Sequence, residues 1–102
     1  MVLLELSVVP LGEGASVSRY VARCLDILDS SGLDYRLNAM GTIVEGQLDD
    51  VLSVLRQCIE VTAGQCDRVT CTAKIDYRKG AHGRLAGKVA SVQEKIDRPL
   101  RT

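Results

Sequence analysis

Apolar residues near the amino terminus recur at every second position. From Val2 to Val9 one face of the chain is wholly apolar, and the other mixes apolar side chains with Glu5 and Ser7. This alternation predicts a strand over residues 2–9 with its apolar face against a core. Pro10 ends the strand, because proline has no N–H to donate to a neighbouring strand.

Two longer segments carry apolar residues at helical spacing. The first helix is predicted from Ser16, a good N-cap, to Gly32, which suits the position after a helix end. The second runs from Leu48 to Gly64 and has acidic residues in its first turn, where a helix favours negative charge. The apolar stripe of the first is Val17, Tyr20, Val21, Cys24, Leu25 and Leu28; that of the second is Leu48, Val51, Leu52, Leu55, Cys58, Ile59 and Thr62.

Between the helices lie two short strands joined by a tight turn. Residues Leu33–Asn38 and Thr42–Gly46 are expected to pair as an antiparallel hairpin, with Gly41 permitting the turn. Side chains alternate between sheet faces, so the position of the turn decides which face carries each one. This matters most for three polar or thioether residues of the hairpin, which are Asn38, Met40 and Thr42.

The carboxyl-terminal third predicts one more strand and one more helix. Arg68–Arg78 alternates between an apolar face and a wholly polar one, and Arg84–Ile96 carries a narrow apolar stripe. Lys79–Gly83 connects the two as a loop. We expect residues 1–97 to form a single domain and residues 98–102 to be a frayed tail.

This order of elements predicts a ferredoxin-like α+β fold, βαββαβ, with an added C-terminal helix and a four-stranded antiparallel sheet. Both main helices cover one face of the sheet, and the core there takes Leu4, Leu6, Val8, both helical stripes, Val69, Cys71, Ala73 and Ile75. No further layer is available for the other face. That face is therefore expected to bind a ligand, a second subunit or both.

Composition excludes several classes of protein. The 102 residues hold 13 basic and 13 acidic side chains, which argues against a mainly electrostatic binder of nucleic acid. The apolar start contains Glu5 and no basic region, so neither a signal peptide nor a membrane span is expected, and a cytoplasmic location follows. Four cysteines without a C-x-x-C pair and a single histidine predict no metal site, no metal cofactor and free thiols.

Five segments, taken together, resemble the small thiamine-binding protein family: Glu5–Gly12, Ser18–Val21, Tyr35–Gly46, Lys74–Arg78 and Lys88–Val92. The match runs in order from about Val2 to Ile96. The resemblance implies a ferredoxin-like chain assembled as dimers and tetramers. It also implies binding of thiamine or its hydroxymethyl-pyrimidine moiety, with no cofactor and no established catalysis. The chain has Ala39 where the family usually has proline, and Gly83 where threonine is common.

The resemblance makes eight residues candidates for ligand contact: Glu5, Ser7, Asn38, Met40, Thr42, Thr72, Lys74 and Asp76. An aminopyrimidine needs hydroxyl, amide or backbone groups at short range, and Met40 offers a soft apolar surface to its ring. Glu5 or Glu45 is placed to offset a thiazolium charge. Plainer roles remain open, because Glu5 also suits a salt bridge, Asn38 a turn and the row from Thr72 to Asp76 an interface.

Three other functions remain as alternatives. The first is a structural or regulatory oligomer without a thiamine ligand. The second is a small acyl-phosphate hydrolase using Arg19 and Asn38, but Leu11–Ala15 lacks a phosphate-cradling pattern and Glu13 repels an anion. The third is an RNA-binding sheet, which needs aromatic residues on its strands, whereas only Tyr77 lies on the last strand. No catalytic residue is assigned.

Overall fold

The computed structural model describes residues 1–14 and 17–102, so the N-cap predicted at Ser16 lies outside the described residues. In chain order the elements are β1 (Val2–Pro10), α1 (Ser18–Ser31), β2 (Asp34–Asn38), β3 (Gly41–Gly46), α2 (Leu48–Ala63), β4 (Val69–Tyr77) and α3 (Arg84–Gln93). The bounds of these elements differ from the sequence prediction by up to three residues. The largest difference is at the end of α3, which stops at Gln93 instead of the predicted Ile96.

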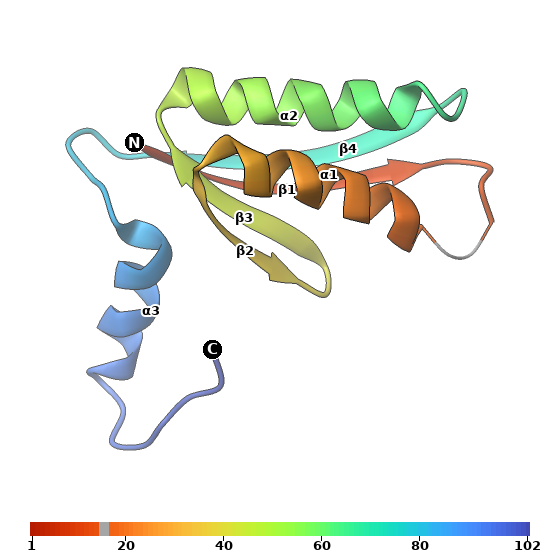
Figure 1. The fold of residues 1–102 in the computed structure, drawn as a ribbon. Coiled ribbons are helices and arrows are strands. Elements are labelled where there is room, and N and C mark those ends of the chain that lie inside the picture. Colours follow the sequence, from red (N-terminus) through yellow and green to blue (C-terminus); the bar gives the residue numbers. More distant parts are fainter. Residues whose placement is uncertain (15–16) are drawn as a thin grey trace.

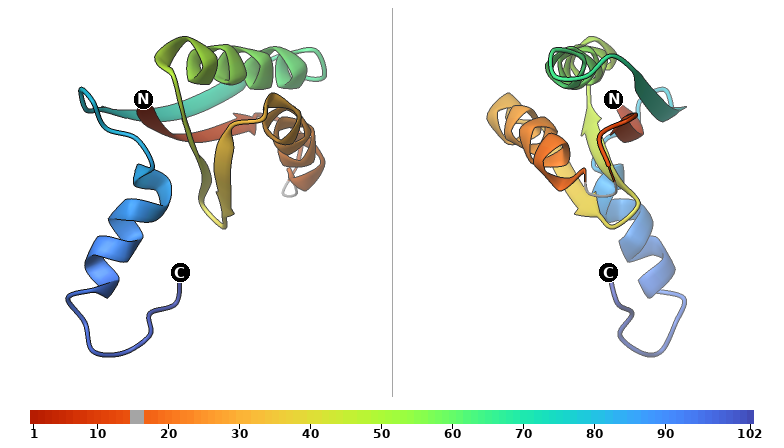
Figure 2. Two further views of the ribbon diagram at one scale, coloured as in Figure 1. Left: turned by 60° about the vertical axis from the view of Figure 1, so that its left-hand side comes forward. Right: turned by 90° about the vertical axis from the view of Figure 1, so that its right-hand side faces the viewer.

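The strands form one antiparallel sheet in the order β2-β3-β1-β4. Helices α1 and α2 lie side by side on one face of it (Figures 1 and 2). This is the predicted ferredoxin-like arrangement with an added C-terminal helix, and the fold prediction is confirmed.

The core lies between β1 and the two helices. Alternate β1 side chains point toward the helices, as the period-two pattern requires, and each such buried aliphatic side chain contributes about 1.5–3 kcal/mol. With no Phe or Trp in the chain, Tyr20 is the largest fully buried side chain. The other buried apolar residues are Val2, Leu4, Leu6, Val8, Cys24, Leu28, Val44, Val51, Val54 and Cys58.

Strand register fixes the hairpin turn at Ala39–Met40, because Asn38 pairs with Gly41. Thr42 lies opposite Leu6 and Val44 lies opposite Leu4, so both point to the helix side and are buried. Asn38 belongs to the opposite face. The three hairpin residues therefore do not share a face, and Met40 stands at the tip with 92% of its surface exposed.

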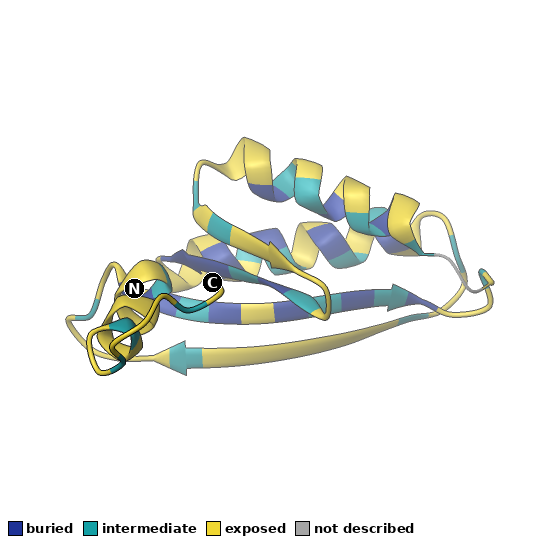
Figure 3. Cartoon of the chain, turned by 90° about the horizontal axis from the view of Figure 1, so that it is seen from below, coloured by how far each residue is buried: buried dark blue, intermediate teal, exposed yellow. Residues whose placement is uncertain are grey.

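Strand β4 departs from the predicted core. Cys71, Ala73 and Ile75 were expected under the helices, but all three are exposed in the single chain, Ile75 to 43%. Figure 3 shows almost the whole strand exposed along one edge of the molecule. The reason is position: β4 is an edge strand, and the helices cover mainly the inner strands beside it.

Helix α3 projects away from the sheet and is held at its first turn (Figure 2). The radius of gyration is 15.0 Å, against about 13 Å for a compact domain of this length. Val89 and Val92 of its apolar stripe remain exposed. The chain therefore presents two apolar surfaces that its own fold leaves uncovered, one on β4 and one on α3.

Candidate functional site

A cavity of about 160 Å³ lies between the amino-terminal half of α1, the hairpin turn and the end of β1. Its wall is mainly apolar. Six of its lining residues carry the argument below: Ser7, Val8, Cys24, Asn38, Met40 and Thr42.

The cavity exists because β1 is longer than β3. Strand β3 pairs with β1 only as far as Leu6, opposite Thr42. Strand β1 continues to Pro10, and there it pairs only with β4 on its other side. The hairpin turn and α1 enclose the open edge that remains.

The backbone of Val8 faces this open edge. A Cβ built on Gly41 would lie 3.1 Å from the Leu6 carbonyl oxygen, so that carbonyl points toward β3. The Leu11 N–H, in contrast, donates to the Arg68 carbonyl on the β4 side at 2.8 Å. N–H and C=O directions alternate along an antiparallel strand, so even-numbered residues of β1 face β3. The Val8 N–H and C=O therefore point into the cavity beyond the end of β3.

Four of the eight predicted ligand residues line this cavity: Ser7, Asn38, Met40 and Thr42. Thr42 is buried, Ser7 is half-buried, and Asn38 and Met40 are exposed at the rim. These four residues belong to different faces of the sheet, but they meet at the cavity because β3 ends there and no longer separates the two faces.

Three others lie elsewhere. Glu5, Lys74 and Asp76 line a shallow hollow of about 170 Å³ on the face opposite the helices, where Glu5 pairs in register with Lys74. Thr72, opposite Ser7 in register, lines neither cavity. The structure thus divides the predicted residues between two places instead of bringing them into one site.

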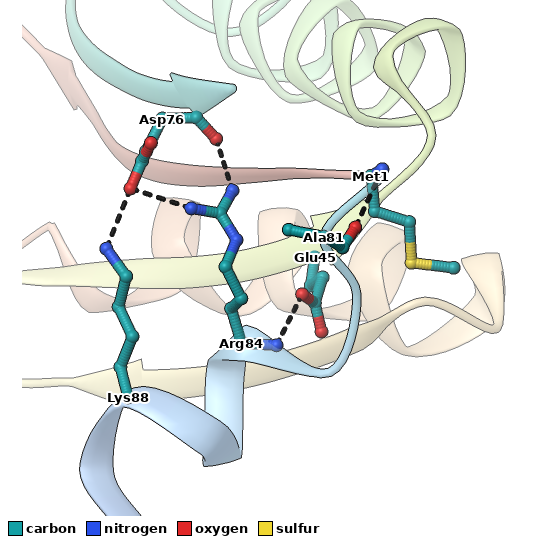
Figure 4. A network of polar contacts seen from close by, with 6 residues as sticks. All are labelled: Met1, Glu45, Asp76, Ala81, Arg84 and Lys88. Atoms are coloured by element: carbon teal, nitrogen blue, oxygen red, sulfur yellow. Dashed lines mark hydrogen bonds and ion pairs between the residues drawn. The ribbon is translucent and has the colours of Figure 1, made fainter. Parts of the chain in front are cut away.

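Asp76 is already engaged within the chain. Its carboxylate accepts hydrogen bonds from Lys88 Nζ at 2.7 Å and from Arg84 Nη1 at 2.9 Å, and Arg84 Nη2 donates to its carbonyl (Figure 4). The Lys88 bond, followed by that of Arg84, lowers the pKa of Asp76 below its usual value. These contacts fasten α3 to β4.

Glu45 also holds α3 in place. The first turn of α3 covers it, only 4% of its surface is exposed, and its Oε2 accepts the Arg84 backbone N–H at 2.7 Å (Figure 4). A helix begins with unpaired N–H groups, and α3 has no side-chain cap from its own N-cap residue, Gly83. Glu45, which was a candidate partner for the positive charge of a thiazolium ring, therefore caps the amino terminus of α3.

Of the six lining residues named above, Val8 and Cys24 were not predicted as site residues. Both were assigned to the core, which is correct for their side chains. The signal for Val8 was available, since the predicted first strand is longer than the returning hairpin strand and an overhang must leave an edge open. Nothing in the sequence pointed to Cys24 as a cavity residue.

Cys24 is paired across the helices with Cys58. The Cys24 Sγ lies 3.8 Å from the Cys58 carbonyl oxygen and 3.7 Å from Thr62 Oγ1, while Cys58 Sγ lies 3.8 Å from the Cys24 carbonyl oxygen. The Cys58 side chain lowers the pKa of Cys24 to about 7, against the opposing effect of burial. The Cys24 side chain, together with burial, raises the pKa of Cys58.

The residues considered for acyl-phosphate hydrolysis do not share a cavity. Arg19 donates to the Tyr20 hydroxyl at 2.8 Å and its guanidinium lies 4.8 Å from the centre of that ring, whereas Asn38 lines the hairpin cavity.

Residues 1–14 and 17–102 contain no group of three or more metal-binding side chains. No helix in these ranges is both long and apolar enough to cross a membrane.

Comparison with known proteins identifies relatives along nearly the whole chain. A family model described as thiamine-binding protein matches residues 4–93. UPF0045 protein MJ1052 of Methanocaldococcus jannaschii is 37% identical over 93 residues, which cover 91% of this chain and 93% of that protein. The crystal structure of MJ1052 superposes with a TM-score of 0.85 at 36% identity and covers 91% of this chain and 96% of that one.

A second solved structure supports the fold alone, because its identity is low. It is a candidate thiamine biosynthesis/salvage protein from Thermotoga maritima, with a TM-score of 0.78 at 22% identity, covering 89% of this chain and 97% of that one.

UPF0045 protein Mb1933 of Mycobacterium bovis is 34% identical over 99 residues, which cover 96% of this chain and 97% of that protein.

Proposed function

The chain belongs to the thiamine-binding protein family, and we propose that it binds thiamine, or a precursor such as hydroxymethyl-pyrimidine, in the hairpin cavity without catalysing a reaction. The observation that carries this proposal is the open strand edge at Val8, in a cavity with a mainly apolar wall that also includes Ser7, Asn38 and Thr42. The family model described as thiamine-binding protein, which matches residues 4–93, supports a thiamine-related role.

Size favours the pyrimidine as the buried part of the ligand. The cavity measures about 160 Å³, and an apolar cavity of about 150 Å³ is known to hold one benzene ring. A two-ring ligand does not fit entirely within this volume. We therefore place the pyrimidine inside the cavity and the thiazolium of thiamine outside, near the exposed Met40.

The polar groups suit an aminopyrimidine. This ring presents an amino donor beside a ring-nitrogen acceptor, and an open strand edge presents an acceptor carbonyl beside a donor N–H on the same residue. Val8 supplies that pair, and the hydroxyl of Thr42 stands close by on the wall. Such a small number of placed polar groups within an apolar wall is typical of ligand sites.

Charge contributes little to this site. No aspartate, glutamate, lysine, arginine or histidine among residues 1–14 and 17–102 lines the cavity. Glu45 is engaged with α3, and Glu5 lies in the hollow on the opposite face. The thiazolium cation therefore gains no ion pair, and we expect uncharged hydroxymethyl-pyrimidine to bind about as tightly as thiamine.

The proposal of a non-catalytic role rests on the same wall. A general acid–base mechanism needs a titratable side chain within hydrogen-bond reach of the bound substrate. Among the described residues, the cavity wall offers one titratable side chain, the Cys24 thiol, and no histidine, lysine or carboxylate to act with it; its other polar side chains are neutral hydroxyl and amide groups. Binding, and delivery or sensing of the ligand, fit these groups better than turnover does.

We further propose that the working form is a homo-oligomer, a dimer or tetramer. An edge strand with free backbone groups invites pairing with another chain, and β4 also exposes Ile75 and Tyr77. The apolar stripe of α3 is a second uncovered surface. Light scattering after size-exclusion chromatography tests this, and a monomer at micromolar concentration would contradict it.

Isothermal titration calorimetry tests the ligand. Separate titrations with thiamine and with hydroxymethyl-pyrimidine are expected to show saturable binding, whereas the isolated thiazole alcohol is expected to show none. The absence of binding by both pyrimidine compounds at millimolar concentration would reject the proposal. It would also favour the alternative of a structural or regulatory oligomer.

A further inference from the structure

We propose that Cys24 and Cys58 form a peroxide-oxidisable pair that can close into a disulfide between α1 and α2, with Cys24 reached through the hairpin cavity. The pair lies in the interface where the two helices run side by side (Figure 2). Each sulfur lies 3.8 Å from the backbone carbonyl oxygen of the other cysteine, so the two side chains face one another across the interface. The inference does not require that the cavity bind thiamine.

The two cysteines differ in access. Cys24 lines the cavity and has 5% of its surface exposed, so a small oxidant that enters the cavity reaches this residue. Cys58 has no exposed surface and lines none of the cavities described above. Reactive cysteines are those with thiolate character and access, often beside a second cysteine that resolves the first product. Cys24 therefore reacts first and Cys58 resolves.

The chemistry balances with hydrogen peroxide as the oxidant. The Cys24 thiolate attacks one peroxide oxygen, an S–O bond forms, the O–O bond breaks, and hydroxide leaves with the proton that Cys24 gave up, as water. The Cys58 sulfur then attacks the Cys24 sulfenic acid, so that an S–S bond forms and the S–O bond breaks. The departing hydroxide takes the Cys58 proton as a second water. Two thiols and one peroxide thus give one disulfide and two waters.

The surroundings favour this closure over further oxidation. The sulfenic acid forms beside Cys58, whose carbonyl oxygen lies 3.8 Å from the Cys24 sulfur and whose side chain solvent does not reach, so Cys58 is placed to resolve it. Cys66 follows the end of α2, and Cys71 lies on the exposed edge strand β4. Oxidation would therefore tie α1 to α2 at the wall of the cavity and make its shape depend on redox conditions.

The test uses the full chain with Cys66→Ser and Cys71→Ser, which leaves only the proposed pair. Treatment of the folded protein with hydrogen peroxide is expected to remove both titratable thiols, lower the intact mass by two hydrogens and yield a peptide linking residues 24 and 58. Folded protein that keeps both thiols, or that gains oxygen without the link, overturns the proposal.

Two matched variants in this background test the order of reaction. With Cys58→Ala, the remaining Cys24 is expected to give a sulfenic acid that dimedone traps; with Cys24→Ala, the remaining Cys58 is expected to stay unlabelled. Equal labelling of the two would overturn the assigned route through the cavity. Circular dichroism confirms that each variant is folded. The peptide link in the parent protein decides the matter if either variant is not.

Discussion

Glu45→Gln is the substitution that most sharply separates a structural carboxylate from a ligand carboxylate. The Glu45 side chain is buried and its Oε2 accepts the first free N–H of α3 at 2.7 Å. Glutamine keeps the length and the acceptor oxygen but removes the negative charge. We expect α3 to loosen from the sheet while the hairpin cavity, on which Glu45 does not border, is unchanged.

The magnitude follows from the hydrogen bond. A bond to a charged acceptor is worth about 1.5–3 kcal/mol and a neutral one about 0.5–1.5 kcal/mol, so the substitution costs about 1–2 kcal/mol. The loss of a negative charge at the amino terminus of α3 also weakens the attachment of the helix, because a helix amino terminus favours negative charge. Since 1–2 kcal/mol corresponds to a factor of roughly 5–30 in an equilibrium constant, detachment of α3 becomes more frequent by that factor.

Glu5→Gln is the matched control. It removes the same charge from a neighbouring strand, but Glu5 is exposed and caps no helix. Its effect is expected to stay within about 0.5 kcal/mol.

Hydrogen exchange followed by mass spectrometry measures protection of residues 84–93 in both variants. If Glu5→Gln loosens α3 as much as Glu45→Gln does, the capping role of Glu45 is wrong. If Glu45→Gln abolishes binding of hydroxymethyl-pyrimidine while α3 remains protected, Glu45 is a ligand residue after all.

Two further predictions concern pH and the glycines. The lowered pKa of Asp76 means that its ion pairs stabilise the attachment of α3 fully above the unfolded pKa of about 3.9 and lose effect as the pH falls through the lower folded pKa. The protection factors of the α3 amides, which correct for the intrinsic exchange rate at each pH, should therefore fall below about pH 4 and stay constant between about pH 5 and 8; a fall in protection from pH 8 to pH 5 would contradict this. Gly46→Ala places a Cβ 3.0 Å from Leu33 Cδ2 and 3.3 Å from Val51 Cγ1 in the core, with an expected cost of about 1–3 kcal/mol. Gly87→Ala, inside α3 with nothing within 4 Å, should instead stabilise by about 0.4–1 kcal/mol; urea unfolding compares the two, and equal effects would refute the packing argument.

The sequence was sufficient for the fold because its periodicities are strong. The alternation in β1, the stripes of α1 and α2 and the glycine near the turn each predict one element, and their order admits few topologies. The errors in predicted burial arose on α2, where Leu48 and Leu52 of the predicted core stripe are 41% and 40% exposed, and on β4. Cys71, Ala73 and Ile75 alternate as core residues do, but periodicity does not reveal that β4 is an edge that the helices leave uncovered.

The candidate site was predictable only in part, because it depends on register. Ser7, Asn38, Met40 and Thr42 converge, although Thr42 and Asn38 belong to opposite faces, since the hairpin ends beside a longer strand. Glu5, Lys74 and Asp76 are excluded from that cavity by the same alternation. The engagement of Asp76 and Glu45 with α3 required the path of the loop before α3, which carries no strong sequence signal.

The most direct test of the central claim is an NMR titration of the ¹⁵N-labelled protein with hydroxymethyl-pyrimidine. The proposed site predicts saturable chemical-shift changes at the amides of Val8 and residues 38–42. Thr42→Val should weaken the affinity for the ligand about 2- to 12-fold, because it removes one hydrogen bond worth about 0.5–1.5 kcal/mol. Thr72→Val should leave the affinity unchanged. Shifts centred on Glu5, Lys74 and Asp76, or no saturable shift at millimolar ligand, would contradict it.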